Sequence, residues 1–222
     1  MAAIIVSVVL GALIALGVTI STEHLRKPKL ELRISQHTEG AYEDRPAKRA
    51  RFLHLELVNH PPPWWAVWML RSAAVQCHGT ISFHHLDGQD VFGRTMAVRW
   101  SGLPEPVPIR LTLNGMEGVV IDPVRLSGPS RVDVHPGENE VFDVAARFDD
   151  EDECYGWSNE SYFSDPKWRN PRWKLGKGRY IVKVAITSAG EKVIGLYRLI
   201  NDVPQSDFKL ATSAKGDSVR ED

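Results

Sequence analysis

The sequence predicts an all-β protein, an antiparallel immunoglobulin-like β-sandwich preceded by one N-terminal transmembrane α-helix. An uncharged run at the N-terminus predicts the helix, and about eight short strand-like segments separated by turn signals predict the sandwich. No other long segment has the spacing of an amphipathic helix, which argues against a parallel sheet with crossover helices. The two cysteines lack the tyrosine and tryptophan spacing of antibody domains, so the predicted likeness is architectural.

The first element spans residues 2–20, which include no charged side chain. A helix of this length reaches about 28 Å, close to the ~30 Å hydrocarbon thickness of a bilayer. Its first flanking cations are Arg26 and Lys27. Because Lys and Arg are retained on the cytoplasmic side, we predict a single-pass cell-membrane protein with its N-terminus outside and its soluble domain cytoplasmic. An export signal is the alternative, since Ala15-Leu16-Gly17 would pass as a loose cleavage site.

Small residues recur at every fourth position of this helix and include Ser7, Gly11 and Ala15. Such a stripe lets two helices approach closely, which predicts a homodimer through the membrane helix. Small residues are also common in membrane helices in general, so the stripe has an ordinary explanation too.

The composition of the 222-residue chain excludes some classes of partner. It has 27 Lys and Arg against 28 Asp and Glu, for a net charge of −1. This balance gives no global electrostatic reason to bind nucleic acid. The two cysteines, Cys77 and Cys154, lack a CxxC spacing, so we expect buried thiols and not a zinc site.

The soluble region begins with residues 29–34 and 53–57, in which apolar residues alternate with polar ones as in half-buried strands. Asp87-Gly88 and Asn114-Gly115 are hairpin signals, because both residues of such turns tolerate positive φ. The clearest hairpin has its turn at Ser188-Ala189-Gly190-Glu191. The remaining predicted strands are 75–83, 91–100, 107–113, 119–121, 141–148, 179–186 and 193–199.

These elements give a simple domain organisation. We expect an anchor at 1–22, a basic juxtamembrane linker at 23–28 and a β-sandwich domain at 29–210. The domain has a long insert at 149–178, and the polar segment 211–222 is expected to be a disordered tail.

Four motifs carry a resemblance to a known group of proteins. They are Arg51-Phe52-Leu53-His54-Leu55, Arg99-Trp100-Ser101-Gly102 with Pro104-Glu105-Pro106, Cys154-Tyr155-Gly156-Trp157 with Asn159-Glu160, and Asn201-Asp202-Val203-Pro204. Over most of its length, anchor included, the chain resembles uncharacterised prokaryotic single-pass membrane proteins with an immunoglobulin-like β-sandwich domain. The resemblance implies one anchored domain, and it implies neither an activity nor a catalytic residue.

Enzyme motifs are missing from the sequence. Residues 156–160 lack the second glycine of a nucleophile elbow, and Gly176-Lys177-Gly178 precedes a strand instead of opening a helix. We therefore expect no enzyme and no cofactor. An enzyme would need titratable groups in one pocket, for example His84 or Glu160 beside Asp165.

Metal sites are also not expected. Neighbouring residues of a strand point to opposite faces, so His84 and His85 would not share an ion. The acidic run 149–153 would attract calcium, but a run of cations follows it, from Lys167 to Arg179. A solvated or internally compensated charge face is the more economical interpretation.

A basic aromatic loop is the first candidate binding site. Such a pattern suits phosphate contact with base stacking, or an anionic lipid head group. The favoured alternative is structural, with the two tryptophans closing one end of the sandwich. The residues are Lys167, Trp168, Arg169, Arg172, Trp173 and Lys174.

Trp64, Trp65 and Trp68 form the second candidate site. If the strand at 53–58 runs antiparallel to the first strand, the chain returns to the membrane just where these tryptophans occur. Tryptophan is enriched at bilayer interfaces, so we expect them to dock the domain onto the membrane. A cover over one end of the sandwich is the alternative.

Together these observations predict a membrane-anchored, non-enzymatic binding or scaffolding module. The alternative is a reader of an anionic ligand, a lipid head group or nucleic acid, through residues 167–174. Nucleic acid is the less favoured ligand because the chain is close to neutral.

Overall fold

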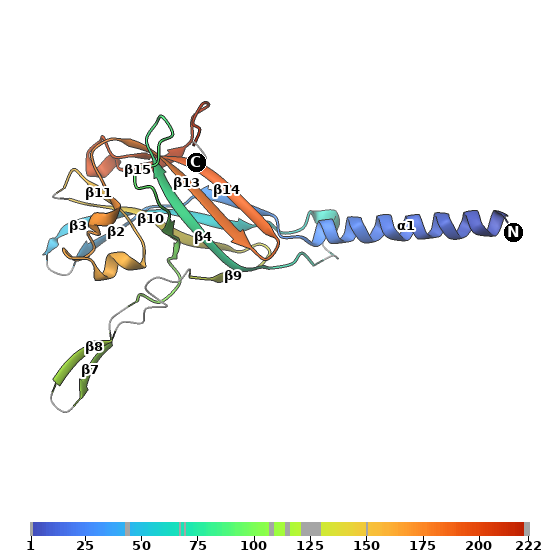
Figure 1. Cartoon of the computed structure of the whole chain (residues 1–222), viewed down its shortest axis with the longest axis horizontal. Helices are drawn as coiled ribbons and strands as arrows, with labels where there is room; N and C mark the ends of the chain where they lie inside the picture. Colours follow the sequence, from blue (N-terminus) through green and yellow to red (C-terminus); the bar gives the residue numbers. More distant parts are fainter. Residues whose placement is uncertain are drawn as a thin grey trace.

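A long helix leads out of a body of antiparallel sheets (Figure 1). The computed structural model describes residues 2–42, 45–66, 68, 70–106, 109–113, 116–120, 130–149 and 151–219. In this part of the chain, one helix, α1 (Ala2–Arg26), is long and apolar enough to cross a membrane. It continues past the predicted anchor boundary at residue 22 and through most of the predicted linker. The next helix breaker is Pro28, which disfavours helical backbone at Lys27.

The first sheet has seven strands in the order β1-β3-β10-β11-β12, with β2 paired to β3 and β6 paired to β10. The register places Leu57 opposite Leu32, and Phe142 opposite Leu55. The strands are β1 (Leu30–Ile34), β2 (Thr38–Tyr42), β3 (Arg45–Asn59), β6 (Arg99–Trp100), β10 (Asn139–Phe148), β11 (Cys154–Gly156) and β12 (Lys174–Leu175).

The second sheet has six strands in the order β15-β14-β13-β4-β5, with β9 paired to β4. Its centre is the predicted hairpin, which is confirmed: Ser188 pairs with Glu191, and Gly190 adopts a positive φ of 91°. The strands are β4 (Ala74–His84), β5 (Met96–Ala97), β9 (Val132–Val134), β13 (Arg179–Ser188), β14 (Glu191–Ile200) and β15 (Lys209–Thr212). A separate two-stranded sheet pairs β7 (Ile109–Leu113) with β8 (Met116–Val120).

One hydrophobic core joins the two large sheets. From β3, Leu53, Leu55 and Leu57 enter it at alternate positions, as the period-two pattern predicts. The second sheet contributes Phe83 and Val184. The coarse prediction, an antiparallel all-β body preceded by one apolar helix, is therefore confirmed.

The prediction of one strand at 91–100 is wrong. The Asp90 carboxylate accepts the backbone N–H groups of Phe92 and Gly93, and this local turn takes the place of a strand. The chain then pairs with the second sheet through β5 and with the first sheet through β6. This segment crosses from one sheet to the other.

The predicted insert and tail are more ordered than expected. The insert contains β11, β12 and two 3-10 turns, η2 (Asn159–Phe163) and η3 (Pro171–Trp173). The segment after residue 210 is not a disordered tail at its start, because β15 pairs with β14 and Arg198 donates two hydrogen bonds to Asp217. The Asp87-Gly88 turn is confirmed, with Gly88 at φ 87°. Asn114-Gly115 lies outside the described residues.

Candidate functional site

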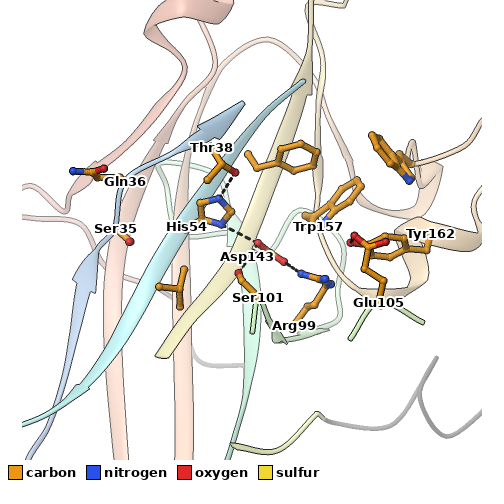
Figure 2. Close-up of a pocket in the computed structure, with 13 residues that line it drawn as sticks. Ser35, Gln36, Thr38, His54, Arg99, Ser101, Glu105, Asp143, Trp157 and Tyr162 are labelled. Atoms are coloured by element: carbon orange, nitrogen blue, oxygen red, sulfur yellow. Dashed lines mark hydrogen bonds and ion pairs between the residues drawn. The ribbon is translucent and has the colours of Figure 1, made fainter. Parts of the chain in front are cut away.

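A cavity lies on the outer face of the first sheet, on the side away from the core (Figure 2). In β3, Leu53 and Leu55 point into the core, so Phe52 and His54 point outward and line this cavity. Its volume is about 450 Å³, within the usual range for small-molecule sites. We call it the outer-face cavity.

Three buried ionisable side chains meet on the floor of the outer-face cavity, His54, Asp143 and Arg99. The sheet register brings them together, because Asp143 in β10 pairs with His54 in β3 on one side and with Arg99 in β6 on the other. Arg99 donates from its guanidinium to Asp143 Oδ2, and Ser101 Oγ donates to Asp143 Oδ1 over 3.0 Å. The floor is thus built by three strands from distant parts of the chain.

His54 extends this polar chain to the rim. Its Nδ1 lies 2.8 Å from Asp143 Oδ1, and its Nε2 shares a 2.8 Å hydrogen bond with the hydroxyl of Thr38. Thr38 is exposed at the start of β2. Figure 2 shows the resulting line from Thr38 through His54 and Asp143 to Arg99.

Burying charges is costly unless they are paired, and here one cation matches one carboxylate. Asp143 and Arg99 cancel without any charge on His54. Arg99 Nε is buried and, in the part of the chain that the structure describes, has no hydrogen-bond partner. A buried N–H without an acceptor is uncommon in folded proteins.

Aromatic rings form the wall of the outer-face cavity. Trp157 stands edge-to-face with Phe52, Tyr162 and Trp168, at centroid distances of 4.9, 5.6 and 5.8 Å. Burial raises the pKa of Tyr162, so its hydroxyl stays protonated and donates to Glu105 over 3.1 Å. The wall is largely aromatic and its rings are in mutual contact, as is common in ligand sites.

A hydroxyl, an imidazole and a carboxylate in line also occur in nucleophilic enzymes. Here the contact between His54 Nδ1 and Asp143 lacks the alignment of a hydrogen bond. In this structure the His54 imidazole is hydrogen-bonded to Thr38 and lies within ion-pair distance of Asp143.

Of the two tryptophans of the basic aromatic loop, Trp173 is buried and Trp168 is half-buried. Trp173 is 4% exposed and belongs to the main core, and Trp168 packs against Phe52 and Trp157. These contacts favour the structural role that the sequence suggested for the pair. Trp168 also lines the outer-face cavity, so it joins the two regions.

The cations of this loop lie beside the acidic run. Arg169 donates to Glu151 and stacks 4.1 Å from the ring centre of Phe148. Lys174 lies 2.9 Å from Glu153 and lowers the pKa of that carboxyl. Lys167 lies 5.7 Å from the Trp168 ring. The predicted internal compensation of the acidic run is thereby confirmed for Glu151 and Glu153.

Arg172 is exposed and lines a second cavity of about 470 Å³, together with Glu160 and Asp165. Glu160 accepts 3.3 Å bonds from Asn170 and from the Trp173 indole, so it serves the packing of the insert. The structure brings Glu160 and Asp165 to one cavity, whereas His84 does not line it.

Trp64, Trp65 and Trp68 lie where the sequence placed them. Asn59 at the end of β3 pairs with Leu30 at the start of β1, which confirms that the chain returns to the helix end of the domain. All three side chains are exposed, and the 3-10 turn η1 (Trp64–Ala66) carries the first two.

The described part of the stripe of small residues on α1 is exposed. Gly11 and Ala15 lie on exposed helix surface, and nothing lies within 4 Å of a Cβ built on Gly11. The side chain of Ser7 lies outside the described residues.

Within the described residues, no three His, Cys, Asp or Glu side chains converge as metal ligands would. Cys77 and Cys154 are free and buried, and burial raises the pKa of Cys77 to about 11. Both thiols therefore stay protonated at neutral pH.

Apart from Trp168, the residues of the outer-face cavity were not among the predicted site residues. His54 and Arg99 occur in the motifs that carry the resemblance, and Asp143 is a carboxylate in the middle of a strand that is otherwise largely apolar. The position of Asp143 could have pointed to the site from the sequence, because an acidic residue in an apolar strand needs a buried partner. Comparisons with protein families, with curated proteins and with solved structures found no match to the chain.

Proposed function

We propose that this protein is a membrane-anchored, non-enzymatic binding module that holds a small ligand in the outer-face cavity. The observation that carries the proposal is the construction of the cavity, with a paired, buried polar floor beneath an aromatic wall. Such a site orients a ligand through a few polar groups and binds it through apolar contact.

We also propose that the domain is an immunoglobulin-like sandwich. Strands β1, β3, β10 and β6 follow one another in the order of strands A, B, E and D of that fold. Strands β4, β13 and β14 follow the order C, F and G. The strand order supports the likeness, and the binding site would then lie on the outer face of the ABED sheet.

The charges of the outer-face cavity indicate the type of ligand. Arg99 is already neutralised by Asp143, and Glu105 adds a negative charge near the mouth. An anion would gain little there. We therefore propose an uncharged ligand with a flat apolar part for the wall and a polar part for the floor.

Three probes test this proposal: benzamide, benzoate and benzylamine share one ring and differ in charge. The full chain, labelled with ¹⁵N-tryptophan in nanodiscs, is titrated with each while the indole signal of Trp157 is followed. We expect a saturable shift with benzamide and weaker effects from the charged probes. If none of the three moves the signal, the cavity is not a ligand site.

Thr38→Val tests the polar floor, and Thr187→Val is its matched control. The first removes the hydroxyl that ends the polar chain, and the second changes an exposed threonine of the other sheet. Loss of one hydrogen bond should weaken benzamide binding about two- to tenfold in Thr38→Val. Equal affinities for both variants would count against the polar floor.

The anchor has its own tests. We propose that the domain is cytoplasmic, so protease added to intact cells should leave the C-terminal segment uncut.

A self-association assay in a bilayer compares the native helix with Gly11→Ile. A large side chain on the stripe should reduce pairing, and unchanged pairing would remove the proposed homodimer.

A further inference from the structure

The loop of residues 60–72 carries four exposed large apolar side chains. Trp64, Trp65 and Trp68 are 86%, 55% and 78% exposed, and Leu70 is 81% exposed. Outside α1, these are the four most exposed large apolar side chains of the described residues. Exposed apolar side chains gathered in one place indicate an interaction surface.

Hydrogen bonds fix this loop beside the end of α1. The backbone N–H of Ser72 donates to the Arg26 carbonyl over 2.7 Å. Arg71 donates to the carbonyls of His60 and Pro61 over 2.8 and 3.1 Å, which ties the beginning of the loop to its end. Figure 1 shows the turn of the loop, in teal, alongside the last part of α1.

The exposure of the helix agrees with this placement. From Val9 to Arg26, all α1 residues are exposed except Thr22 and Leu25, which are half-buried. They lie three positions apart and so share one face of the helix. The loop therefore sits against the final turns of α1.

These turns are at the level of the bilayer interface. The uncharged stretch ends at Ile20, and five more residues to Leu25 add about 7.5 Å along the helix. The head-group layer of one leaflet is roughly 5–8 Å thick. If residues 2–20 occupy the hydrocarbon, the loop lies within that layer or at its edge.

Basic side chains lie near the same end of α1 as the loop and would attract anionic lipid. Arg26 and Lys29 are exposed on either side of the connection from α1 to β1, and Lys27 is 3.8 Å from Glu191 at the tip of the β13–β14 hairpin. Basic groups beside a membrane helix attract anionic head groups. Indole rings add apolar surface and one N–H donor each, which is why tryptophan collects in this layer.

We propose that Trp64, Trp65 and Trp68 insert into the head-group layer of the bilayer that α1 crosses, and that they dock the domain against it. The inference rests on the membrane anchor of the proposed function. The occupant of the surface is lipid, because the loop is hydrogen-bonded to the end of the helix that crosses the membrane. Docking would hold the outer-face cavity at a fixed tilt to the membrane.

Quenching by brominated lipid tests the proposal. The full chain is reconstituted in vesicles of phosphatidylcholine and phosphatidylglycerol, with the phosphatidylcholine either natural or brominated near the top of its acyl chains. Three of the seven tryptophans belong to the loop. We expect quenching of the native chain and roughly threefold less in a variant with Trp64→Phe, Trp65→Phe and Trp68→Phe.

Two further variants separate docking from simple proximity. Arg71→Met removes the bonds from the Arg71 side chain to the His60 and Pro61 carbonyls and the 3.4 Å bond to the Leu25 carbonyl of α1. The loop should then be held less firmly, so quenching should fall while the chain stays in the membrane. Arg71→Lys keeps the charge but not the forked bonding, and it should give an intermediate value. Trp157→Phe is the matched control, because this buried tryptophan should contribute nothing to lipid quenching.

The outcomes are distinct. A chain that alkaline carbonate extracts from membranes would refute the anchor, and with it the proposed function. A chain that stays in the membrane and shows equal quenching in the native and triple-variant forms would overturn the docking alone. So would tryptophans that are shielded only in cross-linked dimers, since a second copy would then cover the surface.

Discussion

The insert (residues 149–178) and the 60–72 loop both contain tryptophans, which are buried or half-buried in the insert and exposed in the loop. In the insert, Trp157 and Trp173 are 3% and 4% exposed and stand edge-to-face with other rings. In the loop, Trp64 and Trp68 are mostly exposed. The difference follows from position, because the insert folds over a sheet and the loop lies beside a membrane-type helix.

The comparison teaches that neighbouring charges alone do not identify a binding tryptophan. Lys174 and Arg169 seemed to form a ligand site with the insert tryptophans, yet both lie against acidic residues of the same insert. The loop tryptophans stack on no other ring among the described contacts. Their surface is available for a partner outside the domain.

The largest expected difference between the regions is in stability. Trp173→Ala leaves a cavity in the main core and should lower the free energy of unfolding by about 3–5 kcal/mol. Trp64→Ala removes an exposed ring and should change it by less than about 0.5 kcal/mol in detergent. Urea unfolding of both variants checks this, and similar losses would break the comparison.

A smaller effect is expected at Gly156, which lies against Trp173. A Cβ built there would be 3.1 Å from Met96 Sδ, 3.1 Å from Phe83 and 3.2 Å from Trp173 Cβ. Gly156→Ala should therefore cost about 1–3 kcal/mol through overpacking. Gly40→Ala is the control, since the nearest atom is 3.7 Å away. Equal thermal unfolding midpoints for the two would show that the insert packs more loosely than described.

The smallest effect concerns pH at the start of the loop. Hydrogen bonds from Arg33 and then His60 lower the pKa of Glu31 from 4.5 to about 2. Because the folded-state pKa is the lower one, the stabilisation is complete above about pH 4.5 and is lost as the pH falls towards 2. The urea midpoints of native chain and Glu31→Gln should differ at pH 6 and converge near pH 2.5. A difference that stays constant across this range would contradict the assignment.

Much of the architecture was accessible from the sequence because it depends on local patterns. The uncharged run, the alternation around Leu55 and the turn at Gly190 each carry their own signal. The return of the chain to the helix end followed from the antiparallel pairing of two strands. Short strands such as β9 and β12 carried no such pattern and were not predicted.

The outer-face cavity was not accessible in this way. Asp143 meets Arg99 and His54 only through the register of three strands, and the Arg99 to Asp143 bond spans 44 positions. The crossing between sheets depends on one carboxylate, Asp90, capturing two backbone N–H groups. Local periodicity contains neither kind of information.

The most direct test of the account is to ask which tryptophans meet lipid. The seven indole signals of the ¹⁵N-tryptophan-labelled chain in nanodiscs are recorded with spin-labelled lipid and, separately, with a water-soluble gadolinium chelate. We predict that the lipid label broadens the signals of Trp64, Trp65 and Trp68 and spares Trp100, Trp157, Trp168 and Trp173. Broadening of the three loop signals by the chelate alone would contradict the account.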